Sequence, residues 1–143
     1  MFRALDELLA VACEVDRGGV RAIDRDDVRQ QLGTFVADVH VNALLSAYGE
    51  SRALHGTGDA ADAPLSKIFF SEINLALSEY GMRLQGGDGV RIEGDPHAFA
   101  DGWWQDAFMY ARAFTIAGGA NEVLRNIVAE RALGMPREQA ATR

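Results

Sequence analysis

Residues on which disulfides, metal sites and membrane spans depend are scarce in this sequence. A single cysteine, Cys13, excludes an internal disulfide and is typical of a protein from the reducing cytoplasm. The three histidines, His40, His55 and His97, show no Glu-x-x-His or His-x-x-x-His spacing, so no metal site is expected. The apolar runs are only a few residues long, which excludes a membrane span. We therefore expect a cytoplasmic protein that binds no metal.

Positive charge is the other scarce feature. The chain has 14 lysines and arginines against 21 aspartates and glutamates, giving a net charge of −7 at pH 7, and its only lysine is Lys67. Because no basic face is evident, nucleic acid and anionic membranes are not expected as partners. Hydrophobic residues make up 48% of the 143 residues, which indicates one domain with a substantial core.

Apolar residues recur at helical spacing along most of the chain, and no segment shows the alternation of a strand. The predicted helices cover about residues 2–14, 25–54, 64–84, 98–115 and 121–133. Polar or glycine-rich loops are expected over residues 16–23, 55–63 and 85–96. This pattern predicts an all-α domain, an antiparallel four-helix-bundle-like fold with an extra short helix.

Polar residues, proline and glycine mark the expected helix ends. Asp24 is expected to cap the second helix, and Pro64 is expected at the first position of the third. Asp101 and Asn121 are the expected caps of the fourth and fifth helices. Gly134 follows the last periodic residue and predicts a clean stop.

The third predicted helix carries apolar residues on more than one side. Leu65, Ile68 and Phe69 lie on one face, whereas Ile73 and Leu77 belong to a second face. A helix of this kind is buried from more than one direction. The pattern therefore indicates either a central position in the bundle or an oligomer interface.

Two adjacent glycines, Gly118 and Gly119, separate the fourth predicted helix from the fifth. A glycine hinge before a helix N-terminus offers free backbone N–H groups and the positive end of a helix dipole, which suit an anionic ligand. The same residues also fit a simple interhelical turn. A second glycine cluster, residues 86–89, follows a helix, so we interpret it as a helix end and turn and not as a dinucleotide fingerprint.

The segment 114–136, FTIAGGANEVLRNIVAERALGMP, resembles the closing segment of acyl-CoA dehydrogenases, the flavin enzymes that desaturate acyl-CoA thioesters. The positions that match the family pattern are Ile116, Gly119, Glu122, Val123, Arg125, Ile127, Ala129, Glu130 and Arg131. Upstream, residues 67–71 resemble part of the third helix of the family's C-terminal bundle, and residues 85–89 resemble the glycine loop that follows it. The resemblance covers the chain from about Asp24 onward.

The resemblance implies that two segments of this chain contact FAD. One segment, at the start of the last helix, would lie at the diphosphate and ribose of FAD and consists of Ala120, Asn121 and Glu122. The other, at the end of the third helix, would approach FAD from a partner subunit and consists of Arg83, Leu84, Gln85, Gly86 and Gly87. The chain departs from the family pattern at Ala120, where threonine is usual, and at Arg83, where glutamine is usual.

The position of the family's catalytic base carries a glycine here. Many members place a glutamate immediately before the conserved glycine of this motif, and Gly118 takes that place in this chain. By the same resemblance, Gly118 and Gly119 would face the substrate. Some branches use a glutamate from the first helix of the bundle instead, but that helix is largely absent here. No residue of this chain is therefore assigned as catalytic.

The implied parent function is the FAD-dependent α,β-desaturation of an acyl-CoA thioester in fatty acid or steroid degradation. Electrons would pass to an electron-transferring flavoprotein, and the bundle would form a homo- or hetero-oligomer. Residues 1–143 correspond to the C-terminal bundle alone, and the N-terminal helical and middle β domains of a whole member are expected to be absent. The isolated chain is therefore not expected to be active. The alternative is a non-catalytic interaction or assembly module derived from the same fold.

Overall fold

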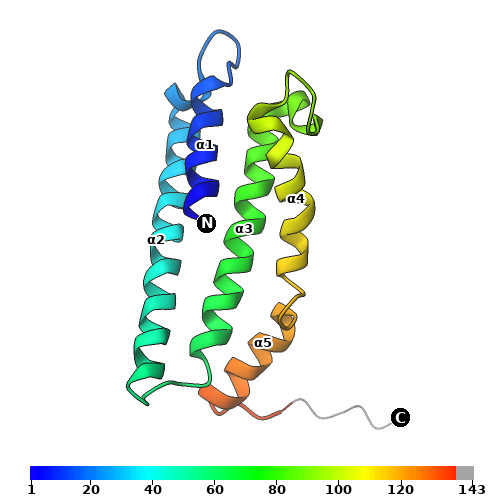
Figure 1. Ribbon diagram of the computed structural model, residues 1–143. Helices are drawn as coiled ribbons and strands as arrows, with labels where there is room; N and C mark the ends of the chain where they lie inside the picture. The colour runs from blue at the N-terminus through cyan, green and yellow to red at the C-terminus, as the bar shows by residue number, and fades with distance from the viewer. Residues whose placement is uncertain (138–143) are drawn as a thin grey trace, which may run out of the picture.

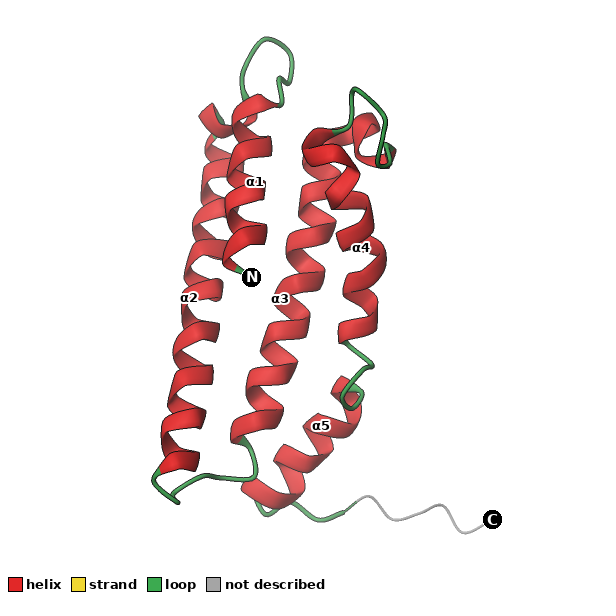
Figure 2. Ribbon diagram, in the orientation of Figure 1, coloured by secondary structure: helices red, strands yellow, loops and turns green. Residues whose placement is uncertain are grey.

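A computed structural model describes residues 1–137 and contains helices and loops but no strand within that range (Figure 2). The α-helices are α1 (Phe2–Glu14), α2 (Asp26–Leu54), α3 (Asp62–Gln85), α4 (Trp103–Phe114) and α5 (Asn121–Ile127). Shorter 3-10 segments are η1 (Ala22–Asp24), η2 (Gly86–Val90) and η3 (Phe99–Gly102), and a π-helical turn, η4 (Val128–Ala132), extends α5. The all-α prediction is confirmed.

The helices form an elongated bundle in which α2 and α3 run side by side along the full length (Figure 1). The shorter α1 lies beside one half of α2, while α4 and then α5 follow α3 in succession (Figure 1). Helix α3 packs against each of α1, α2, α4 and α5. Its apolar residues on more than one side are therefore explained by a central position in the bundle.

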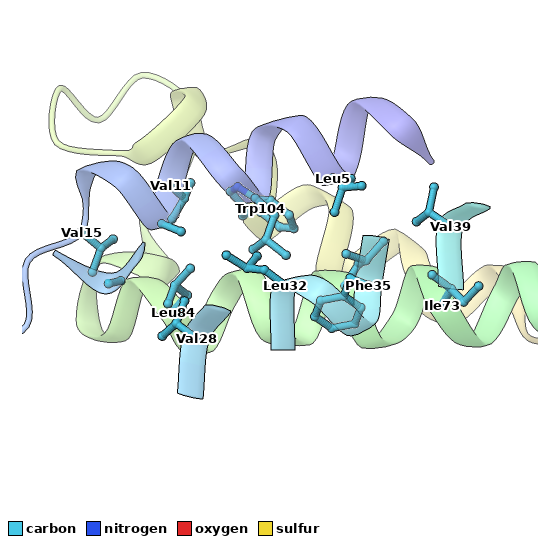
Figure 3. Close-up of a cluster of buried hydrophobic side chains, with 14 residues drawn as sticks. Leu5, Val11, Val15, Val28, Leu32, Phe35, Val39, Ile73, Leu84 and Trp104 are labelled. Carbon is cyan, nitrogen blue, oxygen red and sulfur yellow. The ribbon is translucent and has the colours of Figure 1, made fainter. Parts of the chain in front are cut away.

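The hydrophobic core gathers where α1, α2, α3 and α4 meet, and Figure 3 shows its side chains pointing into the space between these helices. Trp104 of α4, Leu8 of α1 and Leu77 of α3 are the largest fully buried members. Burying a side chain of this kind stabilises the fold by roughly 1.5–3 kcal/mol. The core therefore holds α1 and α4 firmly against the central α3.

The starts of α2 and α3 differ from the prediction. Helix α2 begins at Asp26 after Arg25, and Asp24 instead lies in η1 and pairs with Arg21 at 2.8 Å, so the predicted Asp24 cap is wrong. The ion pair with Arg21 uses the same Asp24 carboxylate oxygens that a helix cap would need. Helix α3 begins at Asp62, so Pro64 is its third residue and not its first. A proline is tolerated there because no N–H of the first turn has an acceptor within the helix.

The segment before α4 is also less regular than predicted. The segment η3, Phe99–Gly102, is a 3-10 turn in which Ala100 and Asp101 have φ angles of 48° and 52°. The Asp101 carboxylate accepts a hydrogen bond from the Gly94 N–H at 3.0 Å and does not cap α4, whose N-cap residue is Gly102. The predicted Asp101 cap is therefore wrong, because the side chain ties down the preceding loop instead.

The last helix begins and ends at special residues. Asn121 is the first residue of α5 and not its cap, and its side chain is buried against α3, so the predicted capping role is wrong. At the other end, Gly134 has a φ of 66°, and the Met135 N–H closes the helix on the Ala129 carbonyl at 2.9 Å. The predicted stop at Gly134 is confirmed, because a left-handed glycine is the usual helix end.

Candidate functional site

The turn between α4 and α5 is built on two left-handed glycines. Gly118 and Gly119 have φ angles of 69° and 106°, a region that residues with a side chain rarely adopt. The Asn121 N–H closes the turn by donating to the Thr115 carbonyl at 3.0 Å. The glycine pair therefore folds the chain back sharply enough to start α5 beside the lower end of α3 (Figure 1).

The backbone amides of this turn are available to a ligand. Among residues 1–137, no hydrogen bond is donated by the N–H of Gly118, Gly119 or Ala120. Both glycines are exposed, and a Cβ added to Gly118 would meet nothing within 4 Å. A chemical group with oxygen acceptors could therefore approach this backbone closely, which a side chain at these positions would hinder.

A polar cluster of Lys67, Ser71 and Asn121 holds the turn against α3. Lys67 Nζ donates to the Gly119 carbonyl at 2.6 Å and to Asn121 Oδ1 at 2.8 Å. Asn121 Nδ2 donates to Ser71 Oγ at 3.0 Å, and both Ser71 and Asn121 are buried. The Asn121 side chain therefore has its hydrogen-bond partners within the protein. Its role is to position the backbone of the residues on either side of it.

The second predicted segment lies at the opposite end of α3. Gly86 has a φ of 63° and ends the helix, and Gly86 and Gly87 are exposed together with Arg83. Leu84 is buried in the core, and Gln85 is buried with its Nε2 donating to the Gly81 carbonyl at 2.9 Å. Of this segment, the side chain of Arg83 and the glycine backbone thus face outward.

The structure does not bring the two predicted segments together within one chain. Lys67 marks the turn end of α3 and Gln85 marks the loop end, and 18 positions of continuous helix separate them. At 1.5 Å per residue this separation is about 27 Å along the axis. Residues 118–122 and residues 83–87 therefore lie at opposite ends of α3.

Sequence reasoning gave no role to two residues that hold these segments in place. Arg17, in the loop after α1, donates from Nη2 to the Arg83 carbonyl at 2.6 Å and to the Leu84 carbonyl at 3.0 Å. It thereby caps the C-terminal end of α3, where the Arg83 carbonyl also accepts a hydrogen bond from the Gly86 N–H. Lys67 and Ser71 hold the glycine turn. Two features of the sequence could have indicated this role. Lys67 and Ser71 are four residues apart and so share one helix face, and Lys67 is the only lysine.

The resolved pKa shifts lie away from the glycine turn. The His97 backbone N–H, followed by the Arg91 guanidinium, holds the pKa of Asp95 below its usual value. Burial raises the pKa of Tyr80, which packs against Phe35 in the core. Within residues 1–137 no group of three or more histidine, cysteine or acidic side chains is placed to hold a metal ion, and no helix has the length and apolar character to cross a membrane.

The class of protein follows from the comparison with known families. Residues 1–133 match the family model of the acyl-CoA dehydrogenase C-terminal domain, and the chain therefore belongs to this family. The resemblance stated from the terminal motif is confirmed.

Individual relatives come from mycobacteria. The chain is 42% identical over 74 residues to the acyl-CoA dehydrogenase IpdE1 of Mycolicibacterium smegmatis, covering 52% of this chain and 18% of the relative. It is 31% identical over 137 residues to the acyl-CoA dehydrogenase FadE29 of Mycobacterium tuberculosis, covering 92% of this chain and 33% of the relative. The chain thus spans about a third or less of the length of these relatives.

Solved structures show the same fold in longer chains. The ChsE4-ChsE5 complex from Mycobacterium tuberculosis is similar with a TM-score of 0.82 and 29% identity, over 96% of this chain and 36% of that one. The Tcur3481-Tcur3483 steroid ACAD is similar with a TM-score of 0.84 and 26% identity, over 96% of this chain and 34% of that one. The first of these structures is described as a complex of two differently named proteins.

Proposed function

We propose that this chain is the FAD-contacting and oligomerising C-terminal domain of an acyl-CoA dehydrogenase that desaturates an acyl-CoA thioester between its α and β carbons. The observation that carries the proposal is the exposed glycine turn in a chain that belongs to this family. The backbone N–H groups of residues 118–120 in this turn donate no hydrogen bond within residues 1–137. The N-terminal helical domain and the middle β domain are not part of residues 1–143, so we propose that the complete active site forms only when those parts are supplied.

The turn segment is the proposed contact with the FAD diphosphate and ribose. Ala120 and Glu122 flank the buried Asn121, and the backbone amides on the glycine side of Ala120 are directed to no acceptor within the described chain. Gly118 and Gly119 are proposed to face the acyl-CoA thioester. Bound FAD would supply the acceptor for the hydride that leaves the substrate, and the residues of this chain would bind and orient it.

The loop after α3 is the proposed contact with a second FAD. Because Arg83, Gly86 and Gly87 lie about 27 Å along α3 from the turn, one copy cannot place both segments on one small region. Two subunits arranged with opposite ends together would combine a turn from one with a loop from the other. This arrangement is supported by the similar ChsE4-ChsE5 structure, which is described as a complex, and it leads us to propose a homo- or hetero-oligomer.

Catalysis by this chain alone is not proposed. Gly118 stands where a base is often found, and no other residue of the chain is proposed for proton removal. A base would come from another part of the enzyme. We propose an acyl-CoA with a fatty or steroid side chain as substrate, an electron-transferring flavoprotein as acceptor and a cytoplasmic location. The steroid alternative is supported by the relative described as a steroid ACAD.

A domain exchange tests the proposed cofactor role. The chain replaces the corresponding C-terminal segment of the Mycolicibacterium smegmatis IpdE1, with which it shares 42% identity over 74 residues. We expect the chimera to purify with FAD, visible as flavin absorbance, and the isolated chain to purify without it. A folded chimera without flavin, beside an IpdE1 control that carries it, would contradict the proposal.

A second candidate, a non-catalytic assembly module, is favoured by the exposed apolar side chains of α2. Val41, Leu44 and Tyr48 are 51%, 70% and 61% exposed although they are large and apolar. Exposed groups of this kind often mark interaction surfaces. Sedimentation at micromolar concentration distinguishes the possibilities, because a well-folded monomer that associates with no partner would exclude an assembly role.

A further inference from the structure

The only lysine in the chain lies directly behind the glycine turn. We propose that Lys67 is a positioning residue, which holds the Gly118–Gly119 turn in one conformation and so sets the backbone that faces the cofactor. The nature of the bound group rests on the proposed function. The holding role itself rests on contacts within this chain.

The hydrogen bonds of the cluster leave only one consistent orientation for the Asn121 amide. An ammonium group has donors and no acceptor, so the Asn121 atom beside Lys67 must be the oxygen. The amide nitrogen then donates to Ser71 Oγ, and the Ser71 hydroxyl is free to donate to the Ile68 carbonyl at 2.9 Å. Lys67, Asn121 and Ser71 are thus joined by hydrogen bonds, and the lysine determines which way the Asn121 amide faces.

Besides Lys67, the turn is closed by one backbone hydrogen bond, from the Asn121 N–H to the Thr115 carbonyl. Glycine loses more backbone freedom on ordering than any other residue, and here two glycines are adjacent. The Gly119 carbonyl has no partner other than Lys67 within residues 1–137. Removing the ammonium would leave that carbonyl unpaired and the Asn121 oxygen buried without its charged donor, so the turn would sample other conformations.

A second contact between α3 and α5, an ion pair, provides a matched control for Lys67. Arg125 of α5 forms an ion pair with Glu72 of α3, and both side chains are about half exposed. An exposed pair of this kind contributes little stability, and the hydrogen bond of Arg125 is to Glu72 and not to the turn. Comparing variants of Lys67 and of Glu72 therefore distinguishes a role in holding the turn from a general role in attaching α5 to α3.

Hydrogen exchange of the isolated full chain tests the holding role. In Lys67→Met we expect the amides of Asn121 and Leu124, which donate to the Thr115 and Ala120 carbonyls, to exchange about tenfold faster, because a lost hydrogen bond to a charged group is of that order. Glu72→Gln should leave those rates unchanged, and both variants should keep the wild-type melting midpoint within about 5 °C. Unchanged rates in Lys67→Met, or equal acceleration in Glu72→Gln, would overturn the proposal.

A chemical rescue distinguishes the ammonium group from the bulk of the side chain. Lys67→Cys in a Cys13→Ser background carries one thiol, which 2-bromoethylamine alkylates in the unfolded chain with loss of bromide, restoring an ammonium at the same reach. We expect alkylation and refolding to return the exchange rates to the wild-type range. Rates that stay fast after complete alkylation would contradict the role of the charge. If Lys67→Met does not fold, Lys67→Gln takes its place.

The chimera described above links the holding role to the cofactor. There we expect Lys67→Met to weaken FAD binding at least about tenfold, with Glu72→Gln unchanged. A chimera that binds no FAD in wild-type form contradicts the proposed function, while the exchange experiment still decides the role of Lys67. Faster exchange together with unchanged FAD affinity would overturn the claim that the held turn faces the cofactor.

Discussion

The indole of Trp104 occupies the space that a side chain at residue 81 would need. A Cβ added to Gly81 would lie 2.1 Å from Trp104 Cε3 and 2.4 Å from Cζ3. Trp104 is 1% exposed, so its ring cannot move aside into solvent. The close packing of α4 on α3 therefore depends on a missing side chain in α3.

Replacing this glycine should weaken the bundle more than replacing an open one. We expect Gly81→Ala to lower the free energy of unfolding by about 2 kcal/mol, because overpacking exceeds the helix-propensity gain of alanine. Gly33→Ala is the control, since a Cβ there meets nothing within 4 Å and the residue lies inside α2. It should stabilise the fold by up to about 1 kcal/mol. Urea unfolding measures both, and equal effects would contradict the packing described.

A second close approach lies at the start of α4. Gly102 has a φ of 76°, and a Cβ there would lie 2.4 Å from the Glu93 nitrogen. Gly94→Ala provides the comparison, because Gly94 has a φ of 85° but open space around it. Both substitutions carry the left-handed strain of about 1–2 kcal/mol. We expect Gly102→Ala to cost at least about 1 kcal/mol more, and a smaller loss than in Gly94→Ala would contradict the contact.

Arg17 is predicted to stabilise the end of α3 through the two carbonyls that it caps. We expect Arg17→Met to destabilise the chain by about 1 kcal/mol and to loosen the amides of residues 85–87. Arg21→Met removes an exposed arginine from the same loop, where it pairs with Asp24, and should change stability by less than about 0.5 kcal/mol. Chemical denaturation with hydrogen exchange checks both. If the two variants behaved alike, the capping role would be wrong.

The loop before α4 should respond to acid through Asp95. The His97 N–H and the Arg91 guanidinium lower the pKa of this carboxyl below its ordinary value of 3.8. A lowered pKa means that the contribution is present above pH about 4 and is lost as the pH falls through the folded-state pKa. An NMR titration of the Asp95 carboxyl carbon should give a midpoint below 3.8. Arg91→Gln should move that midpoint upward, and an unmoved midpoint would contradict the assignment to Arg91.

The helices and the family were accessible from the sequence because both depend on local patterns. Apolar spacing of three and four residues indicates a helix, and the ends of α1, α2 and α3 lie within about two residues of their predicted positions, whereas α4 begins five residues later than predicted. The terminal motif is likewise a contiguous run of residues. The glycine pair at 118 and 119 predicted a sharp turn, since glycine takes positive φ at little cost.

The caps were mispredicted because a polar side chain has more than one possible partner. Asp24 pairs with Arg21, Asp101 holds the Gly94 N–H, and Asn121 is buried against α3. Sequence spacing identifies a side chain that could cap a helix. It does not show which competing group contacts that side chain in the folded structure.

Sequence alone determined that this chain is a helical bundle with a glycine hinge before its last helix, because periodicity and backbone freedom are properties of neighbouring residues. Only the tertiary structure decided that Lys67 reaches the hinge across 52 positions, and that Arg17 closes α3 from 66 positions away. Contacts over such separations arise from the packing of α1 and α5 on α3. The position of the hinge is therefore a property of the assembled bundle and not of the local segment.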